Sequence, residues 1–295
     1  MPRRDRLLAT LVAVLWGANF VAIHVGLQDV PALLFLAIRF VLVAFPLVLL
    51  VPRPRADWRA VVAVGVFMSL GQFALLYVAI ESGMPAGLAS LVLQAQVVLT
   101  IVIAAGALGE RATSRQVVGA VVGTAGLVVV AVGFGADAPL LPLLVTVGAA
   151  LSWAVGNVVA RAAKVSSGLS LVVWSALVVP VPALALSLVV DGPAAVADGL
   201  AAFGWSAALS TLYTVVGASL VGYTIFNGLV AKHPAGAVVP YILLVPPVGM
   251  LSAWIALGEV PNAVEAVGAV VMMAGVAVAT LSRPARVARP AVRAA

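Results

Sequence analysis

The sequence contains no cysteine and very few charged residues. Only 9% of its 295 residues are Asp, Glu, Lys or Arg, whereas a soluble domain has about 25%. The lack of cysteine excludes disulfide bonds and thiolate metal sites. In place of charge, 64% of the residues are hydrophobic and the mean hydropathy is +1.23. These values indicate a membrane protein that lies almost wholly within the bilayer.

Long apolar stretches follow one another along the whole chain. A helical span needs about 20 mostly apolar residues, and the stretches do not alternate as barrel strands do. The predicted fold class is therefore all-α, a polytopic membrane protein with ten transmembrane helices. The predicted spans are 7–27, 32–51, 60–80, 86–107, 115–134, 139–160, 169–190, 203–229, 236–257 and 263–282.

Carboxylates are missing from the middle of every predicted span, and His24 and His233 lie near opposite faces. A proton relay through intramembrane carboxylates is therefore unsupported, and so is a metal site. A membrane hydrolase would need a nucleophile, a base and an orienting acid. We accordingly expect no enzyme activity and no cofactor.

The basic residues lie in alternate loops, and 15 of the 16 share one predicted side. By the positive-inside rule this side is cytoplasmic and holds both termini. Because the net charge of +6 is scattered between apolar spans, it does not indicate nucleic-acid binding. The basic set is Arg3, Arg4, Arg6, Arg53, Arg55, Arg59, Arg111, Arg115, Arg161, Lys164, Lys232, Arg283, Arg286, Arg289 and Arg293. The opposite loops carry Asp29, Glu81, Asp137, Asp191, Asp198, Glu259 and Glu265.

The segment Pro85–Gly126 returns as Pro234–Gly275. The motifs Pro-Ala-Gly, Leu-Gly-Glu, Val-Gly-Ala and Ala-Gly all recur at one offset of 149 residues, which indicates an internal duplication. With five spans in each half, the second half is inserted upside-down. Inverted repeats are frequent in secondary transporters, with substrate near the midplane between them. The expected domains are two five-helix repeats, 1–137 and 138–282, and a basic cytoplasmic tail, 283–295.

Arg39 is the basic residue that lies inside a span. It is about eight residues, or roughly 12 Å, from the external end of the second span. A guanidinium at this depth must pair, face a water-filled cavity or extend toward the interface. Two interpretations stay open: Arg39 receives a substrate carboxylate, or it pairs with backbone carbonyls or an external acid such as Glu81 or Asp29.

The first span of each half contains a tryptophan and an asparagine. Trp16 and Asn19 lie in the first span, and Trp153 and Asn157 lie in the sixth. A buried Asn must be hydrogen-bonded. These residues either line a central cavity, where an indole face can hold an ammonium, or they pack and bond between helices.

The fourth span contains Gln94 and Gln96, which lie about 200° apart on a helix. One is expected to line the cavity and the other to bond a neighbouring helix. Gly119, Gly123 and Gly126 in the next span are expected at close helix contacts. Further polar candidates without a distinguishing spacing are Tyr77, Trp174, Ser175, Tyr213, Tyr223 and Asn227.

The ninth span carries the proline pair Pro246 and Pro247. These prolines leave carbonyls one turn earlier without their usual donors, beside Tyr241. Interrupted helices with free carbonyls point to substrate sites in transporters. The alternative is a kink that only serves packing.

These residues resemble a known family. Ten spans, the run Trp16–Phe20 and the two Leu-Gly-Glu motifs resemble the EamA-type carriers of the drug/metabolite transporter superfamily. Longer runs are similar to its O-acetylserine/cysteine exporter branch, namely Arg39–Pro46, Gly83–Gln96, Trp174–Leu177 and Leu243–Pro246. The resemblance implies efflux of small amino acids or cysteine-pathway metabolites, such as cysteine and O-acetylserine, across a bacterial inner membrane.

The predicted function is a secondary transporter that works by alternating access on a small zwitterion. Its carboxylate requires a cation, for which Arg39 is suited, and its ammonium requires acceptors or aromatic faces. We predict a cavity lined by the first, second, fourth, sixth and ninth spans. The other expected partner is the lipid bilayer, and both a monomer and a homo-oligomer stay open. A membrane-embedded enzyme and a channel or structural subunit are the alternatives.

Overall fold

A computed structural model describes residues 1–134, 140–163, 168–233 and 235–281. Within these residues every regular element is a helix, and ten helical spans are long and apolar enough to cross a membrane. The spans agree with the predicted ones within a few residues at each end, which confirms an all-α, polytopic membrane protein. The expected repeat boundary at residue 137, Lys164, Pro234 and the tail 283–295 lie outside the described residues.

Five of the spans are single helices. The 19 residues of the second span measure about 28 Å at 1.5 Å per residue, close to the hydrocarbon thickness of about 30 Å. These helices are α1 (Arg3–Gly26), α2 (Ala32–Leu50), α7 (Ser114–Gly133), α8 (Leu140–Ala162) and α16 (Ala263–Thr280).

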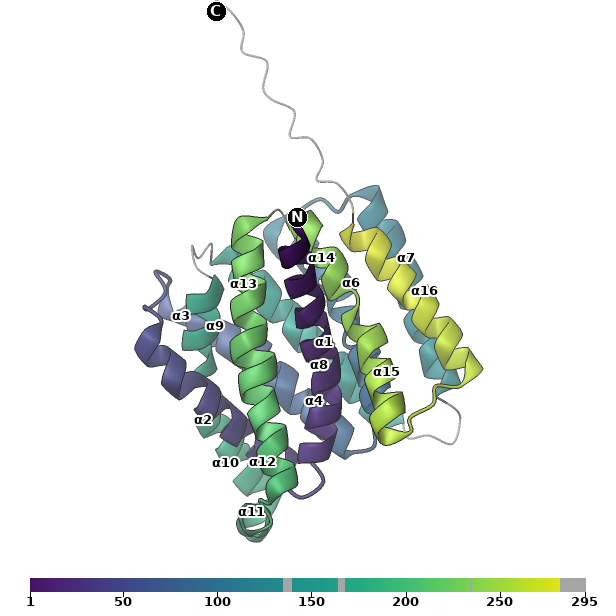
Figure 1. The fold of residues 1–295 in the computed structure, drawn as a ribbon. Coiled ribbons are helices and arrows are strands. Elements are labelled where there is room, and N and C mark those ends of the chain that lie inside the picture. The colour runs from purple at the N-terminus through teal and green to yellow at the C-terminus, as the bar shows by residue number, and fades with distance from the viewer. Residues whose placement is uncertain (135–139, 164–167, 234, 282–295) are drawn as a thin grey trace, which may run out of the picture.

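The other five spans consist of two or three helical segments each (Figure 1). A short helix, α11 (Gly192–Ala201), follows the seventh span. The segments are α3 (Trp58–Val64), η1 (Gly65–Gly71) and α4 (Gln72–Glu81); α5 (Ala86–Val92) and α6 (Ala95–Leu108); α9 (Gly168–Ala176) and α10 (Pro180–Val190); α12 (Trp205–Leu212), η2 (Tyr213–Val221) and α13 (Gly222–Lys232); α14 (Ala235–Ile242) and α15 (Val245–Leu257).

Local structure repeats at the sequence offset. The fourth and ninth spans are both interrupted, and both end on a left-handed glycine, Gly109 or Gly258. The following helices α7 and α16 both begin with a capping box, on Thr113 and Asn262. The third and eighth spans both contain a π-helical segment. The duplication seen in the sequence therefore extends to helix ends and helix breaks.

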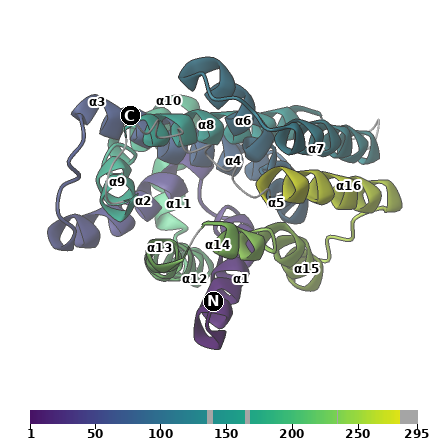
Figure 2. The same ribbon diagram turned by 90° about the horizontal axis from the view of Figure 1, so that it is seen from above.

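The helices α7 and α16 lie side by side in both views and pack through glycines (Figures 1 and 2). A Cβ on Gly119 would lie 2.6 Å from the carbonyl oxygen of Gly275, and a Cβ on Gly268 would lie 3.0 Å from that of Gly126. The repeat offset exchanges Gly119 with Gly268 and Gly126 with Gly275, so these are two equivalent contacts related by the repeat. The close-contact role predicted for these glycines is confirmed. A self-matching antiparallel pair has a local two-fold axis, as an inverted repeat predicts.

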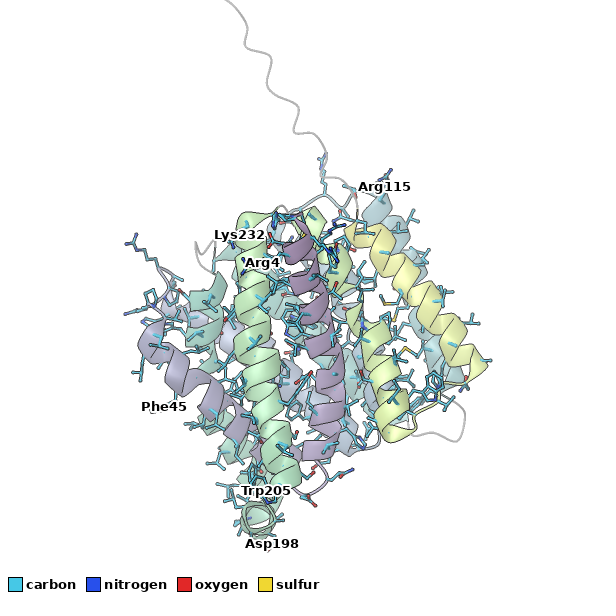
Figure 3. All side chains as sticks on the ribbon, in the orientation of Figure 1. Arg4, Phe45, Arg115, Asp198, Trp205 and Lys232 are labelled. Carbon is cyan, nitrogen blue, oxygen red and sulfur yellow. The ribbon has the colours of Figure 1, made fainter. Side chains whose placement is uncertain are left out.

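The two ends of the bundle differ in charge (Figure 3). Arg4, Arg115 and Lys232 lie at one end, which we call the basic end, and Asp198 lies at the other, the acidic end. This separation follows the predicted alternation of loops. That the basic end faces the cytoplasm stays a prediction.

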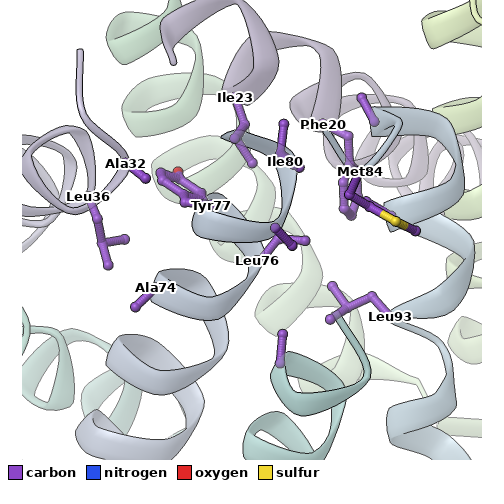
Figure 4. Packing of buried hydrophobic residues seen from close by; sticks show 14 of the residues in the cluster. Phe20, Ile23, Ala32, Leu36, Ala74, Leu76, Tyr77, Ile80, Met84 and Leu93 are labelled. Carbon is purple, nitrogen blue, oxygen red and sulfur yellow. The ribbon is translucent and has the colours of Figure 1, made fainter. Parts of the chain in front are cut away.

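Most residues of the main buried core come from the first four spans and their loops, and the core continues into the second half (Figure 4). Tyr77 of α4 is fully buried among side chains that include Ile23, Leu36 and Ile80. A buried tyrosine hydroxyl usually has a hydrogen-bond partner. That partner is the arginine of the second span.

Candidate substrate site

Arg39 is held inside the bundle by side chains of two neighbouring helical elements, α4 and η2. Its side chain on α2 is only 3% exposed. Nη1 donates to the Tyr77 hydroxyl on α4 at 2.6 Å, and Nη2 donates to Ser219 Oγ on η2 at 3.1 Å. The guanidinium carbon lies 4.5 Å from the ring centre of Phe73. These contacts fix the charged group in the protein interior, away from lipid.

The charge of Arg39 has no carboxylate partner in the described part of the chain. The ion pairs found there are Arg161–Glu110 and His233–Asp5. Glu81, an alternative partner suggested by the sequence, instead accepts the Ala32 amide at 3.0 Å. The Arg39 Nε is buried without a hydrogen-bond partner. A buried cation among neutral groups is costly unless an anion joins it, so the site is suited to an incoming carboxylate.

A cavity opens beside Arg39 between α2, η1, α4, α9, η2 and α13. Its wall is apolar except for Arg39 and a few hydroxyls, which is typical of small-molecule sites. Of the five spans expected to line the cavity, only the second does so here; the third, seventh and eighth supply the rest. The polar lining residues are Arg39, Ser69, Ser175, Ser219, Tyr223 and Thr224.

Trp16 contacts the wall of this cavity from α1. Its Nε1 donates to the Ala218 carbonyl of η2 at 2.9 Å, and its ring centre lies 5.2 Å from that of Tyr223. π-helical segments such as η2 are frequent at functional sites. On the other π segment, η1, Ser152 of α8 donates to the Phe67 carbonyl at 2.7 Å. Each π segment is thus bonded by a side chain from the first span of the other half.

Asn19 lies one turn beyond Trp16 on α1. Its side chain is 7% exposed, and its Oδ1 has no hydrogen-bond partner among the described residues. Buried amide oxygens are nearly always paired, so this unpaired acceptor stands out, although Asn19 is not among the residues that line the cavity beside Arg39.

A second polar group joins α6 to α8. The Asn157 side-chain amide donates to Gln96 Oε1 at 2.9 Å and to Thr100 Oγ1 at 3.4 Å. Gln96 is therefore the glutamine that bonds a neighbouring helix, whereas Gln94 is buried at the N-cap of α6. Trp153, one turn before Asn157, is half-buried against the main core.

The predicted interruption of the ninth span is confirmed. α14 ends at Ile242, and α15 begins with Pro246 buried in its first turn. The fourth span is interrupted at the equivalent place, between α5 and α6, without a proline. The sequence did not indicate this second interruption. Tyr241 packs in a small separate cluster with Leu229 and Val238.

Residues 6–132 and 140–281 both match the EamA-like transporter family. The chain belongs to this family. Membership indicates a transporter and not an enzyme, and each match covers five of the ten spans.

The EamA relatives cover nearly the whole chain. An Escherichia coli (strain K12) protein named "Probable amino-acid metabolite efflux pump" is 40% identical over 281 residues, 93% of this chain and 94% of that protein. A Streptantibioticus cattleyicolor protein named "Probable terminal-alkyne amino-acid exporter" is 30% identical over 277 residues, 90% of each chain. A solved crystal structure with 22% identity has a TM-score of 0.61 over 95% of this chain and 98% of its own; it shows the fold alone.

Several residues around Arg39 in this EamA-family chain were not singled out by the sequence. Tyr77, Ser175 and Tyr223 stood only among candidates without a distinguishing spacing, and Ser219 and Phe73 were not named. A serine in an apolar helix is a weak signal, because its hydroxyl can bond the preceding turn. Ser219 does so, donating to the Thr214 carbonyl at 2.8 Å while it accepts from Arg39.

The bond between Trp16 and η2 carries a testable consequence for stability. Trp16→Phe keeps a ring but removes the indole N–H that donates to the Ala218 carbonyl. Hydrogen bonds between membrane helices contribute about 1 kcal/mol, so the melting temperature of the purified protein should fall by a few degrees. Trp205→Phe is the matched control, since Trp205 is 84% exposed. Equal melting temperatures for the two variants would contradict the role of this bond.

Proposed function

We propose that this chain is a secondary transporter that exports small amino acids or their metabolites across a bacterial inner membrane. The observation that carries the proposal is Arg39, a buried cation that faces a cavity without a carboxylate partner among the described residues. The names of the relatives, for amino-acid metabolite efflux and amino-acid export, support the same class of cargo. The basic end is placed in the cytoplasm, where the substrate enters.

The substrate carboxylate is placed on the Nε edge of Arg39. Nε has no partner among the described residues, and the neighbouring Nη2 donates to Ser219 Oγ, a neutral acceptor that a carboxylate can replace. A guanidinium edge can hold a carboxylate through two parallel hydrogen bonds. The ammonium of a zwitterion is placed on the unpartnered Oδ1 of Asn19 and on the ring faces of Trp16 or Tyr223.

The remaining predicted site residues are proposed to act in another conformation. Like Trp16 and Asn19, none of them is among the residues that line the described cavity beside Arg39. They lie at or near the interruptions of the fourth and ninth spans and on the facing helix α8. A rearrangement of the two halves would change which of these side chains face the substrate. This set is Gln94, Gln96, Trp153, Asn157, Tyr241 and Pro246.

The alternating-access mechanism rests on two inverted five-helix repeats, 1–137 and 138–282. The self-matching contacts of α7 with α16 and the paired helix breaks support this arrangement. If the two halves can pack against each other in two ways, the substrate site between them opens first to one side of the membrane and then to the other.

The finer substrate proposal is cysteine and O-acetylserine. Cells that overproduce the chain should release more of these compounds than cells carrying the empty vector. In reconstituted vesicles, unlabelled substrate on the far side should accelerate uptake of labelled substrate, which only a carrier shows. Release of other amino acids alone would reassign the substrate. A flux indifferent to substrate on the far side would point to a channel and overturn the carrier mechanism.

A further inference from the structure

Two glutamates occupy the same position in the repeats but have different partners. Glu110 and Glu259 each follow a glycine in the left-handed region, Gly109 at φ 66° and Gly258 at φ 70°. A side chain on either glycine would be strained at this angle. The turn ends the helix, α6 or α15, and places the glutamate directly after it.

At the acidic end, Glu259 joins α15 to the start of α5. Its Oε1 accepts the Ala86 amide and its Oε2 accepts the Gly87 amide, both at 2.9 Å. These are the first two amides of α5, which have no partner within the helix. A carboxylate is favoured there, since helix N-termini carry partial positive charge and charged hydrogen bonds are the stronger ones. Leu88 and Met250 line the pocket beside this contact.

At the basic end the repeat predicts the same contact between Glu110 and α14. The amides at the equivalent positions are those of Ala235 and Gly236, where α14 begins. Glu110 Oε2 instead accepts from Arg161 Nη1 of α8 at 2.7 Å, and its side chain is 47% exposed. Helix α14 packs against α1, α13 and α16, whereas α5 packs against α15. Among the described residues, Glu259 thus bonds the start of the opposite helix α5, whereas Glu110 bonds Arg161.

We propose that Glu259 and Glu110 are positioning residues that close the two ends of the transporter in alternation. The structure is the state with the acidic end closed. In the opposite state, Glu259 leaves the amides of α5, and Glu110 exchanges Arg161 for the first amides of α14. The interruptions at residues 93–94 and 243–244 let α5 and α14 move separately from α6 and α15. This inference rests on the alternating access of the proposed function.

The lack of cysteine provides a direct test, because a single introduced thiol is the only one to label. Leu88→Cys reports on the acidic end; its native side chain is 5% exposed. Ala237→Cys, 149 residues later, reports on the basic end, where the native residue is half-buried. Maleimide labelling of purified protein in lipid nanodiscs gives both ends equal access to the reagent.

Glu259→Gln is expected to open the acidic end. A neutral amide offers one acceptor oxygen where the carboxylate offered two, so Leu88→Cys should be labelled about tenfold faster, the effect of losing one charged hydrogen bond. The opposite end should close more often, and Ala237→Cys should be labelled more slowly. Glu110→Gln should leave Leu88→Cys labelling at or below the rate of the parent.

The matched control is Glu265→Gln, which removes a charge at the same end. Glu265 lines the same pocket but accepts the amide of Asn262, the N-cap residue of its own helix α16, at 2.8 Å, so Glu265→Gln should leave both labelling rates unchanged. If Glu259→Gln alters neither site, or accelerates both, the alternating contact is wrong. Met250→Cys, on the α15 side of the pocket, repeats the measurement should Leu88→Cys disturb folding.

Because the labelling assay needs no substrate, it tests the gating contacts independently of the proposed substrate. Reciprocal labelling without efflux of any amino acid would keep the gating contacts and reject the cargo. Efflux that occurs without reciprocal labelling would keep the transporter and reject the gates.

Discussion

Replacing Arg39 by Gln should lower substrate efflux by at least about thirtyfold. Removing one partner of a buried, charged hydrogen bond costs a ligand roughly 2 kcal/mol or more, and in the proposed site the guanidinium is the cation available to the carboxylate. Gln can still bond to Tyr77 or Ser219 but supplies no charge. The measurement is initial efflux from cells with equal amounts of each variant in the membrane.

Arg39→Lys should retain a small part of the activity. An ammonium keeps the positive charge but cannot bond Tyr77, Ser219 and a carboxylate with one planar fork. Arg115→Gln is the matched control, because Arg115 is exposed at the basic end and loses the same charge. Undiminished efflux by Arg39→Gln would remove Arg39 as the substrate ligand and leave it a structural role with Tyr77 and Ser219.

The ten spans could be predicted because their signal is additive. Every residue of a lipid-facing helix contributes to hydropathy, so a window of about 20 residues identifies a span even where single residues are ambiguous. The break in the ninth span could also be predicted, since Pro246 and Pro247 remove backbone donors. The break at Leu93 and Gln94 and the two π segments could not be predicted, because none of these segments contains a proline.

The sequence singled out a residue of the candidate site only where burying that residue in a membrane span costs free energy by itself. Arg39 stands out because a charge within a span needs an explanation. Its partners Tyr77 and Ser219 do not stand out, since Tyr and Ser are ordinary in membrane helices and their meeting depends on how α2, α4 and η2 cross. Similarly, the sequence placed Gln94 and Gln96 on different faces but could not decide that Gln96 meets Asn157.

Replacing Gly126 by Ala should destabilise the protein by about 3 kcal/mol. Its new Cβ would collide with the backbone nitrogen of Met272 and would lie 2.5 Å from the Cα. The backbone of α16 cannot rotate away as a flexible side chain can, so the two helices must separate. Overpacking of a tight contact typically costs about 1–3 kcal/mol. This substitution would also disturb the neighbouring glycine contacts between α7 and α16. Thermal unfolding of the purified protein measures the effect.

Gly123→Ala on the same helix is the matched control. Both glycines were predicted as packing positions, but a Cβ on Gly123 would lie 3.5 Å from Val98 Cγ2 and 3.9 Å from the Met272 carbonyl oxygen, which are ordinary contacts. Ala is also the better helix former by about 1 kcal/mol, so this variant should be as stable as the parent or slightly more so. Equal losses of stability in Gly123→Ala and Gly126→Ala would mean that α7 and α16 do not pack in the register described. The local two-fold axis inferred from their contacts would then be wrong.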